Sequence, residues 1–187
     1  MRVVAGSHRG RVLAAPPGRA LRPTADRVRE SVFNILAHGN FGAGGASILQ
    51  DARVLDAFAG TGAMGIEALS RGAAHATFIE RDRAALDALR ANLRAVNESQ
   101  NATVLGADAL DPPRAAEPVT VAFLDPPYRE GLGPRALVAL TAAGWFAPGA
   151  IVTVEIAARE AFAAPEGFEI LDERRYGAAR VVIVRAS

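Results

Sequence analysis

Acidic residues follow several short apolar runs of this chain, and they are the first candidates for chemistry. Asp56, Glu80, Asp108 and Asp125 each stand at the end of, or just after, a run that predicts a buried strand. The carboxyl ends of parallel strands meet at one edge of a sheet, which is where ligands bind in open α/β folds. We therefore expect these carboxylates to share one cleft.

Asp56 opens the glycine-rich segment Asp56-Ala57-Phe58-Ala59-Gly60-Thr61-Gly62-Ala63-Met64-Gly65. Its glycines permit a tight turn and close backbone approach to a ligand, and the following helix offers unpaired N–H groups. Their spacing also matches G-x-G-x-x-G, a weak dinucleotide signal by itself. A carboxylate at Asp56 would repel a pyrophosphate but would suit the ammonium of a cofactor that carries an amino acid. The plain structural alternative is a strand-to-helix turn with an acidic cap.

The next two acids could bind a nucleoside. Glu80 can accept hydrogen bonds from both hydroxyls of a ribose, which fits NAD and S-adenosylmethionine equally. Asp108, in Gly106-Ala107-Asp108-Ala109, can accept a hydrogen bond from an adenine amino group, although loop aspartates often serve as turn or cap residues. Arg81 beside Glu80 also reads as part of a solvated helix start.

The fourth acid begins Asp125-Pro126-Pro127-Tyr128, directly after the apolar run 121–124. The prolines stiffen this loop and remove two backbone donors, which leaves carbonyl oxygens for a ligand. Asp125 and the Pro126 carbonyl could accept both hydrogens of an exocyclic amine, whose lone pair would then be aimed at an electrophile. Tyr128 offers an aromatic face for stacking an extruded base. The alternative is a rigid turn with a surface tyrosine.

The elements that must position these residues alternate along the chain. Apolar spacing from Thr24 predicts a first helix, and further helices are expected after Gly62, over 86–96 and over 136–143. Predicted strands cover 54–55, 76–79, 103–105, 119–124, 151–155, 168–171 and 181–184. We predict an α/β fold with a seven-stranded, mostly parallel sheet, helices on both faces and an antiparallel C-terminal edge. A small hairpin arm is expected before residue 22.

The whole chain has 187 residues, half of them hydrophobic, which fits one domain. We expect an arm over 1–21 and a catalytic fold over 22–187. Without cysteine, neither disulfides nor thiolate metal sites can form. No signal peptide and no apolar run of membrane-spanning length is seen, so we expect a soluble cytoplasmic protein. Residues 1–36 hold seven arginines against Asp26 and Glu30, which suggests equally a phosphate-facing arm or a solvated tail.

These motifs together resemble the class I S-adenosylmethionine methyltransferases of the amino-methylating branch, marked by (D/N)-P-P-(Y/F/W). The chain resembles the RsmD family, the 16S rRNA guanine-N2 methyltransferases, over nearly its whole length. The residues that carry the resemblance are Arg2-Val3-Val4-Ala5-Gly6, Arg9-Gly10-Arg11, the block Arg22-Pro23-Thr24-Ala25-Asp26-Arg27-Val28-Arg29-Glu30-Ser31-Val32-Phe33-Asn34-Ile35-Leu36, the segments Asp56–Gly62 and Asp125–Tyr128, and Tyr176-Gly177.

The resemblance implies a role for each matching residue. Cofactor contacts are expected from Asp56, Ala57, Phe58, Gly60 and Gly62 at the methionine end, Glu80 and Arg81 at the ribose, and Asp108 and Ala109 at the adenine. Thr24 and Arg27 belong to a helix expected to fold over the cofactor, with capping and ion pairing as the rival role. Asp125, Pro126, Pro127 and Tyr128 are expected to hold the guanine amine, and Arg2, Arg9, Arg11, Arg19 and Arg22 to contact RNA phosphates.

The implied reaction is direct methyl transfer from S-adenosylmethionine to guanine N2, with S-adenosylhomocysteine as product. We expect 16S rRNA as partner, within a small-subunit ribosomal particle, and a monomer without metal or membrane contact. An amino methyltransferase acting on adenine N6 in DNA or RNA, or on a protein glutamine, stays open because these amines are alike. A nicotinamide-dependent oxidoreductase would leave 125–128 unexplained, and intact acids argue against a non-catalytic RNA-binding module.

Overall fold

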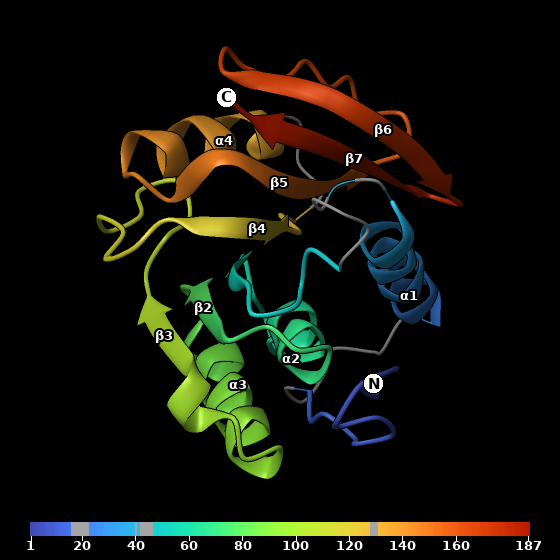
Figure 1. Cartoon of the computed structure of the whole chain (residues 1–187), viewed down its shortest axis with the longest axis vertical. Coiled ribbons are helices and arrows are strands. Elements are labelled where there is room, and N and C mark those ends of the chain that lie inside the picture. The colour runs from blue at the N-terminus through green and yellow to red at the C-terminus, as the bar shows by residue number, and fades with distance from the viewer. Residues whose placement is uncertain (16–22, 40, 42–46, 128–130) are drawn as a thin grey trace.

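The protein is built around one mixed sheet of seven strands. The computed structural model describes residues 1–15, 23–39, 41, 47–127 and 131–187, with only the helical backbone for 23–26. The strand order is β3-β2-β1-β4-β5-β7-β6 (Figure 1). The strands are β1 Arg53–Ala57, β2 His75–Glu80, β3 Ala102–Gly106, β4 Val119–Leu124, β5 Phe146–Ala157, β6 Phe168–Tyr176 and β7 Ala179–Ala186.

The parallel part of the sheet changes direction between β1 and β4. From β1 the chain steps outward to β2 and β3, then returns to place β4 on the other side of β1. All pairings among these strands and β5 are parallel, whereas β5–β7 and β7–β6 are antiparallel. The carboxyl ends of β1 and β4 therefore flank the switch point where doubly wound sheets bind ligands.

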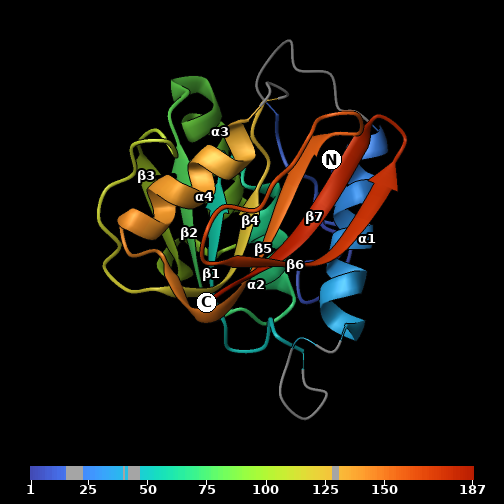
Figure 2. The same cartoon turned by 90° about the horizontal axis from the view of Figure 1, so that it is seen from above.

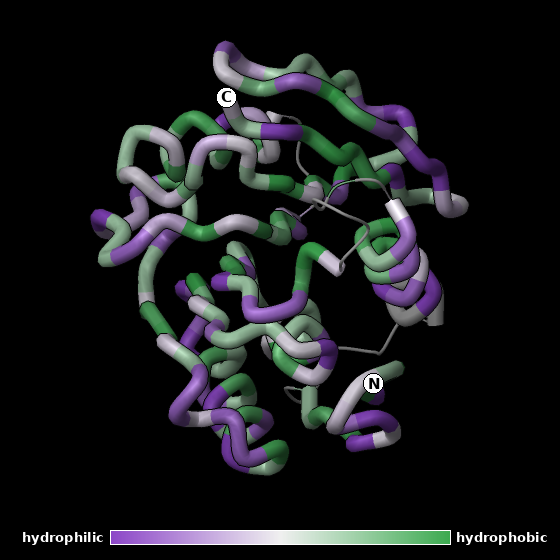
Figure 3. Tube along the Cα trace, in the orientation of Figure 1, coloured by the Kyte–Doolittle hydropathy of each residue, from purple (hydrophilic) through white to green (hydrophobic). Residues whose placement is uncertain are grey.

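Helices cover both faces of the sheet, as expected (Figure 2). One face packs on α1 Pro23–His38, α2 Ala63–Ser70 and α3 Arg83–Ala95, and the other packs on α4 Leu132–Ala142. The Phe33 ring of α1 packs on the Phe123 ring of β4 with 5.2 Å between the centroids and 43° between the ring planes, which holds α1 against the sheet. In α3, green and purple stretches alternate in Figure 3, in keeping with one buried and one solvated face.

The N-terminal arm, residues 1–15, crosses α2 and α3. An antiparallel bridge joins Arg2 to Val12, and the Val3 and Leu13 side chains are buried in the same cluster as α1, α2 and α3. The expected hairpin is thus reduced to one bridge and is packed on the body of the protein. The division at residue 21 stays a prediction.

The predicted elements are present, with shifted ends. β4 matches its predicted range, whereas β1 continues through Asp56 to Ala57, so this acid lies inside the strand. β5 begins at Phe146, five residues before the predicted start, and α4 begins at Leu132, directly after the left-handed Gly131. Helices of the described chain are all too short or too polar to cross a bilayer.

Candidate active site

The glycine turn, residues 58–65, joins β1 to α2 through several left-handed residues. Phe58, Gly60 and Gly62 have φ angles of 63°, 55° and 82°. A Cβ on Gly65 would lie 2.3 Å from the Phe78 ring, so this glycine lets α2 pack closely on β2. A Cβ on Gly60 would meet nothing within 4 Å, so Gly60 faces open space. The turn therefore combines a packing glycine with one beside which a ligand can lie.

Asp56 lies beneath this turn with only 2% of its surface exposed. Its carboxylate accepts a hydrogen bond of 2.9 Å from the Gly65 N–H at the start of α2. Burial raises the pKa of Asp56 well above its ordinary value of 3.8, the Gly65 hydrogen bond opposes that rise, and the charges of Asp125 and Glu80 add to it. Asp56 is thus close enough to Glu80 and Asp125 for their charges to affect its pKa.

Glu80 holds the other side of the turn. One carboxylate oxygen accepts the Gly60 N–H at 2.7 Å, and the other accepts the N–H groups of Arg81 and Asp82 at 2.8 and 2.7 Å. Asp82 caps α3 by accepting the Ala85 N–H at 2.8 Å. The end of β2, the turn and α3 are therefore joined through one side chain, which stays half-buried at the sheet edge.

Asp108 lies after β3 and has partners of its own. Its carboxylate accepts the Leu110 N–H at 3.0 Å and pairs with Arg81 at 2.7 Å. The Leu110 hydrogen bond lowers the pKa of Asp108 most, and Arg81, with Arg135 on α4, lowers it further. Ala109 beside it is buried. Asp108 thus stabilises a local turn through Leu110, and its predicted contact with an adenine stays a prediction.

The β4 loop, described over residues 125–127, lies next to the glycine turn. Ala57 pairs with Leu124 across the β1–β4 ladder, and the Asp125 N–H points to the Ala57 carbonyl at 3.5 Å. Asp125 and Pro127 are exposed, and Pro126 is buried. Tyr128 lies outside the described residues. The start of the β4 loop therefore contacts Ala57, the residue that precedes the glycine turn, at the switch point, and the shared cleft stays a prediction.

The predicted contacts outside this cleft are only partly described. Arg27 is exposed on α1, whereas the Thr24 side chain, Arg19 and Arg22 lie outside the described residues. Arg9 and Arg11 are exposed on the arm, and Arg2 is exposed while donating to the Gly10 carbonyl at 3.2 Å.

Sequence reasoning missed the polar side chains that hold the arm. Glu67 of α2 is fully buried and accepts the N–H groups of Val4 and Ala5 at 2.7 and 3.0 Å, and it also pairs with Arg71. Asn92 of α3 is buried against Ala14. The available signal was a polar residue within an otherwise apolar helix face, since such groups are retained in cores only when paired.

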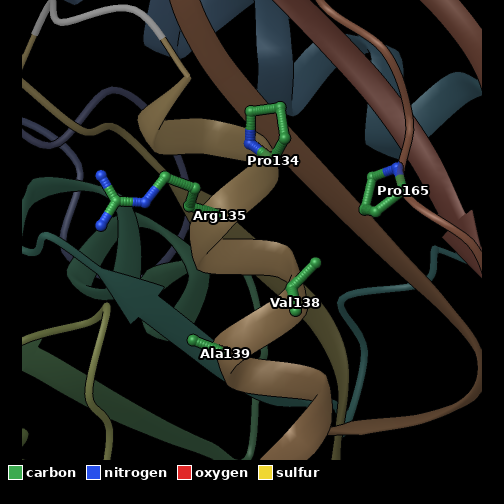
Figure 4. Close-up of a pocket in the computed structure, with 5 residues that line it drawn as sticks. All are labelled: Pro134, Arg135, Val138, Ala139 and Pro165. Atoms are coloured by element: carbon green, nitrogen blue, oxygen red, sulfur yellow. The ribbon is translucent and has the colours of Figure 1, made fainter.

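Other kinds of site would be a metal centre or a separate surface hollow. In the described ranges, no three His, Asp or Glu side chains gather as metal ligands do, and the predicted absence of metal stays a prediction. A shallow hollow beside α4 is lined by Pro134, Arg135, Val138, Ala139 and Pro165 (Figure 4). It shares no residue with the glycine turn or the β4 loop.

Known proteins share this sequence over most of its length. A family described as conserved hypothetical protein 95 matches residues 1–185. Ribosomal RNA small subunit methyltransferase D of Escherichia coli K12 is 43% identical over 156 residues, which cover 83% of this chain and 74% of the relative. The chain belongs to the ribosomal RNA small subunit methyltransferase D family. The Haemophilus influenzae member is 35% identical over 181 residues, 95% of this chain and 89% of its own.

The fold agrees with this family, which is the RsmD family that the motifs resembled. The solved structure of Escherichia coli yhhF superposes with a TM-score of 0.85 at 37% identity, covering 100% of this chain and 98% of that one. The protein is therefore a methyltransferase of the RsmD family, and the seven-stranded α/β fold predicted from its sequence is confirmed.

Proposed function

We propose that this methyltransferase transfers a methyl group from S-adenosylmethionine to the exocyclic N2 of a guanine in 16S ribosomal RNA, which releases S-adenosylhomocysteine and one proton from the amine. The observation that carries the proposal is the contact between the β4 loop and the end of β1, which brings Asp125 beside Asp56 and Glu80. The names of the family members, ribosomal RNA small subunit methyltransferase D, support the RNA substrate.

The residues around the glycine turn fit this cofactor. Gly60 faces open space, so the turn has room for a ligand against its backbone. Asp56 lies beneath the turn, where a nearby ammonium would favour the charged form of its carboxyl group over the neutral form that burial favours, and the exposed part of Glu80 offers acceptors for ribose hydroxyls. The same charges disfavour a pyrophosphate, which argues against NAD. Ala57 and Phe58 would border the methionine part, with Arg81, Asp108 and Ala109 at the adenine and Thr24 and Arg27 closing over it.

When bound, S-adenosylmethionine supplies a methyl group already activated on a sulfonium, so the chain needs mainly to position the acceptor. The Asp125 carboxylate and the Pro126 carbonyl accept the two hydrogens of the guanine amine and turn its lone pair out of the ring plane. Pro127 keeps the loop stiff because its backbone angle is fixed and it lacks an N–H. Tyr128 stacks on the base after it leaves its neighbours.

We propose that the N-terminal part of the chain binds the RNA backbone through Arg2, Arg9, Arg11, Arg19 and Arg22. The guanidinium groups of Arg9 and Arg11, which are exposed on the arm, are suited to phosphates. We also propose a small-subunit particle as the substrate, because the catalytic fold offers little further surface for RNA contacts. In this proposal the enzyme acts as a monomer in the cytoplasm. Replacing Arg9 and Arg11 together by alanine should weaken RNA binding and reduce its salt slope by about 1 to 2. Unchanged affinity and slope would remove both residues from the interface.

The decisive experiment offers labelled S-adenosylmethionine to small-subunit particles, naked 16S rRNA, DNA and protein in parallel, followed by nucleoside and amino-acid analysis. N2-methylguanine in the rRNA is the expected product, with the particle as the better substrate. Methylated adenine or glutamine would replace the proposed acceptor, and equal transfer to naked rRNA would contradict the particle. If calorimetry detected no binding of S-adenosylhomocysteine, the cofactor assignment would be overturned.

A further inference from the structure

The Asn92 side chain connects the N-terminal arm to the glycine turn. It lies on α3 with 2% exposure. Its carbonyl oxygen accepts the Ala14 N–H at 2.8 Å, and its amide nitrogen donates to the Ala14 carbonyl and to the Thr61 carbonyl, both at 3.0 Å. Thr61 stands between Gly60 and Gly62. A single buried amide therefore contacts both ends of the proposed site, where RNA and cofactor would bind.

The hydrogen-bond donors and acceptors around Asn92 allow its side-chain amide only one orientation. Turning it over would place its NH2 against the Ala14 N–H and its oxygen against two carbonyls, so every bond would be lost. An aspartate at this position would meet the same two carbonyls with a carboxylate. Asparagine is thus matched to its partners, and a buried amide that loses a partner is costly.

Other side chains hold the rest of the arm: Arg29 of α1 donates to the Arg2 carbonyl at 2.6 Å, and His8 pairs with Glu98, which follows α3. Glu67 and Ser70 of α2 bind the backbone at Val4, Ala5 and His8. Within the described hydrogen bonds, Ala14 is the part of the arm that reaches the glycine turn through one side chain. The Leu89 side chain, one turn earlier on α3, lies where a Cβ on Gly62 would be, so α3 also packs on the turn. A displacement of the arm at Ala14 would therefore shift the Thr61 backbone through the Asn92 side chain.

We propose that Asn92 is a positioning residue that makes the arm and the glycine turn mutually dependent. RNA held on the arm then favours the turn conformation that binds the cofactor, and the cofactor favours the arm conformation that binds RNA. The RNA half of this proposal rests on the proposed function. Linkage requires the two effects to be equal in size, because both express one coupling free energy.

The test changes the arm and measures the cofactor site. Ala14→Pro removes the N–H that Asn92 accepts, at an exposed position outside the glycine turn. Calorimetry with S-adenosylhomocysteine, without RNA, should show about fivefold weaker binding, and Asn92→Ala about tenfold. Val12→Ala on the arm and Asn101→Ala, whose amide binds only Glu98 among the described contacts, should stay within twofold of the parent.

The double variant tests whether both changes act through one link. Ala14→Pro should weaken binding little further once Asn92 is alanine, because residues in one network are non-additive. Additive losses, or an Ala14→Pro protein that binds like the parent, would overturn the proposal. Melting temperatures above the assay temperature are checked for each variant, so that a loss of affinity is not unfolding.

Reciprocity separates this proposal from the proposed function. With the particle or rRNA present, cofactor affinity should rise in the parent and not in Asn92→Ala. If the parent binds no RNA but Ala14→Pro still weakens cofactor binding, the link stands and the RNA function fails. If RNA is methylated but RNA and cofactor affinities are independent, the link fails and the function stands.

Discussion

The glycine turn and the β4 loop meet at the same switch point but are held in different ways. In the turn, the N–H groups of Gly60 and Gly65 are bound by Glu80 and Asp56, and the Thr61 carbonyl is bound by Asn92. In the β4 loop, Pro126 and Pro127 have no N–H, and Asp125 is exposed. Among the described residues, side chains from three elements hold the turn, whereas two prolines stiffen the β4 loop.

This difference predicts a division of labour. A turn fixed by buried groups presents a ready surface for the cofactor, whereas exposed Asp125 acts only when an acceptor amine arrives. Changes in the β4 loop should therefore reduce turnover, and changes around the turn should reduce cofactor affinity or stability. Single substitutions in each loop separate these effects.

Asp125→Ala should reduce kcat about a thousandfold, because it removes an acceptor that orients the amine in the transition state. The affinity for S-adenosylhomocysteine should change less than twofold. Single-turnover methylation and calorimetry measure the two quantities. Asp87→Ala, which removes an exposed acid of α3, is the matched control. Turnover within tenfold of the parent would take Asp125 out of the mechanism.

Glu80→Ala should raise the Kd for S-adenosylhomocysteine about 10- to 100-fold, since it removes charged acceptors for the Gly60 N–H and for the ribose. At saturating cofactor, kcat should fall much less. Glu80→Gln keeps the side-chain length and should lie between Glu80→Ala and the parent. A loss confined to kcat would contradict the division between the two loops.

Substitutions at Gly60 and Gly65, two of the three glycines of the turn, should have different effects. Gly65→Ala places a Cβ 2.3 Å from Phe78 and should cost about 2 kcal/mol of stability. Gly60→Ala has open space and should cost about 1 kcal/mol through its left-handed backbone, yet it should weaken cofactor binding more. Urea denaturation and calorimetry compare them. Equal affinities in the two variants would mean that the space beside Gly60 holds no ligand.

The position of the glycine turn and of the β4 loop in the fold could be predicted from the sequence. Strand-end acids, the glycine spacing and Asp125-Pro126-Pro127 placed both loops at one edge because alternating strands and helices imply parallel strands, whose carboxyl ends share one edge of the sheet. The spacing did not give the partners of Asn92 and Glu67. These depend on how the arm crosses α2 and α3, a long-range contact that no local periodicity encodes. Likewise, Asp108 at a strand end did not reveal its bond to Leu110, which depends on the turn geometry.

The smallest effect concerns the charge buried beneath the turn. Because burial raises the pKa of Asp56, the folded protein holds a proton here over a pH range in which the unfolded chain has lost it. Stability contributed by this group therefore falls as pH rises from about 4 through the raised pKa. Asp56→Asn can still accept the Gly65 N–H, and it should unfold at higher urea concentration than the parent at neutral pH, with the difference vanishing in acid.

The same substitution should weaken binding of S-adenosylhomocysteine, because an amide cannot neutralise an ammonium. Asp56 would then lower stability while raising affinity, as expected of a group retained for binding. Denaturation across pH and calorimetry at neutral pH test the two halves together, with Asp87→Asn as the exposed control. The contrary outcome is an Asp56→Asn protein that is less stable than the parent at neutral pH and binds the cofactor equally well. The Asp56 carboxylate would then be a structural support of α2, and Glu80 would supply the negative charge at the glycine turn.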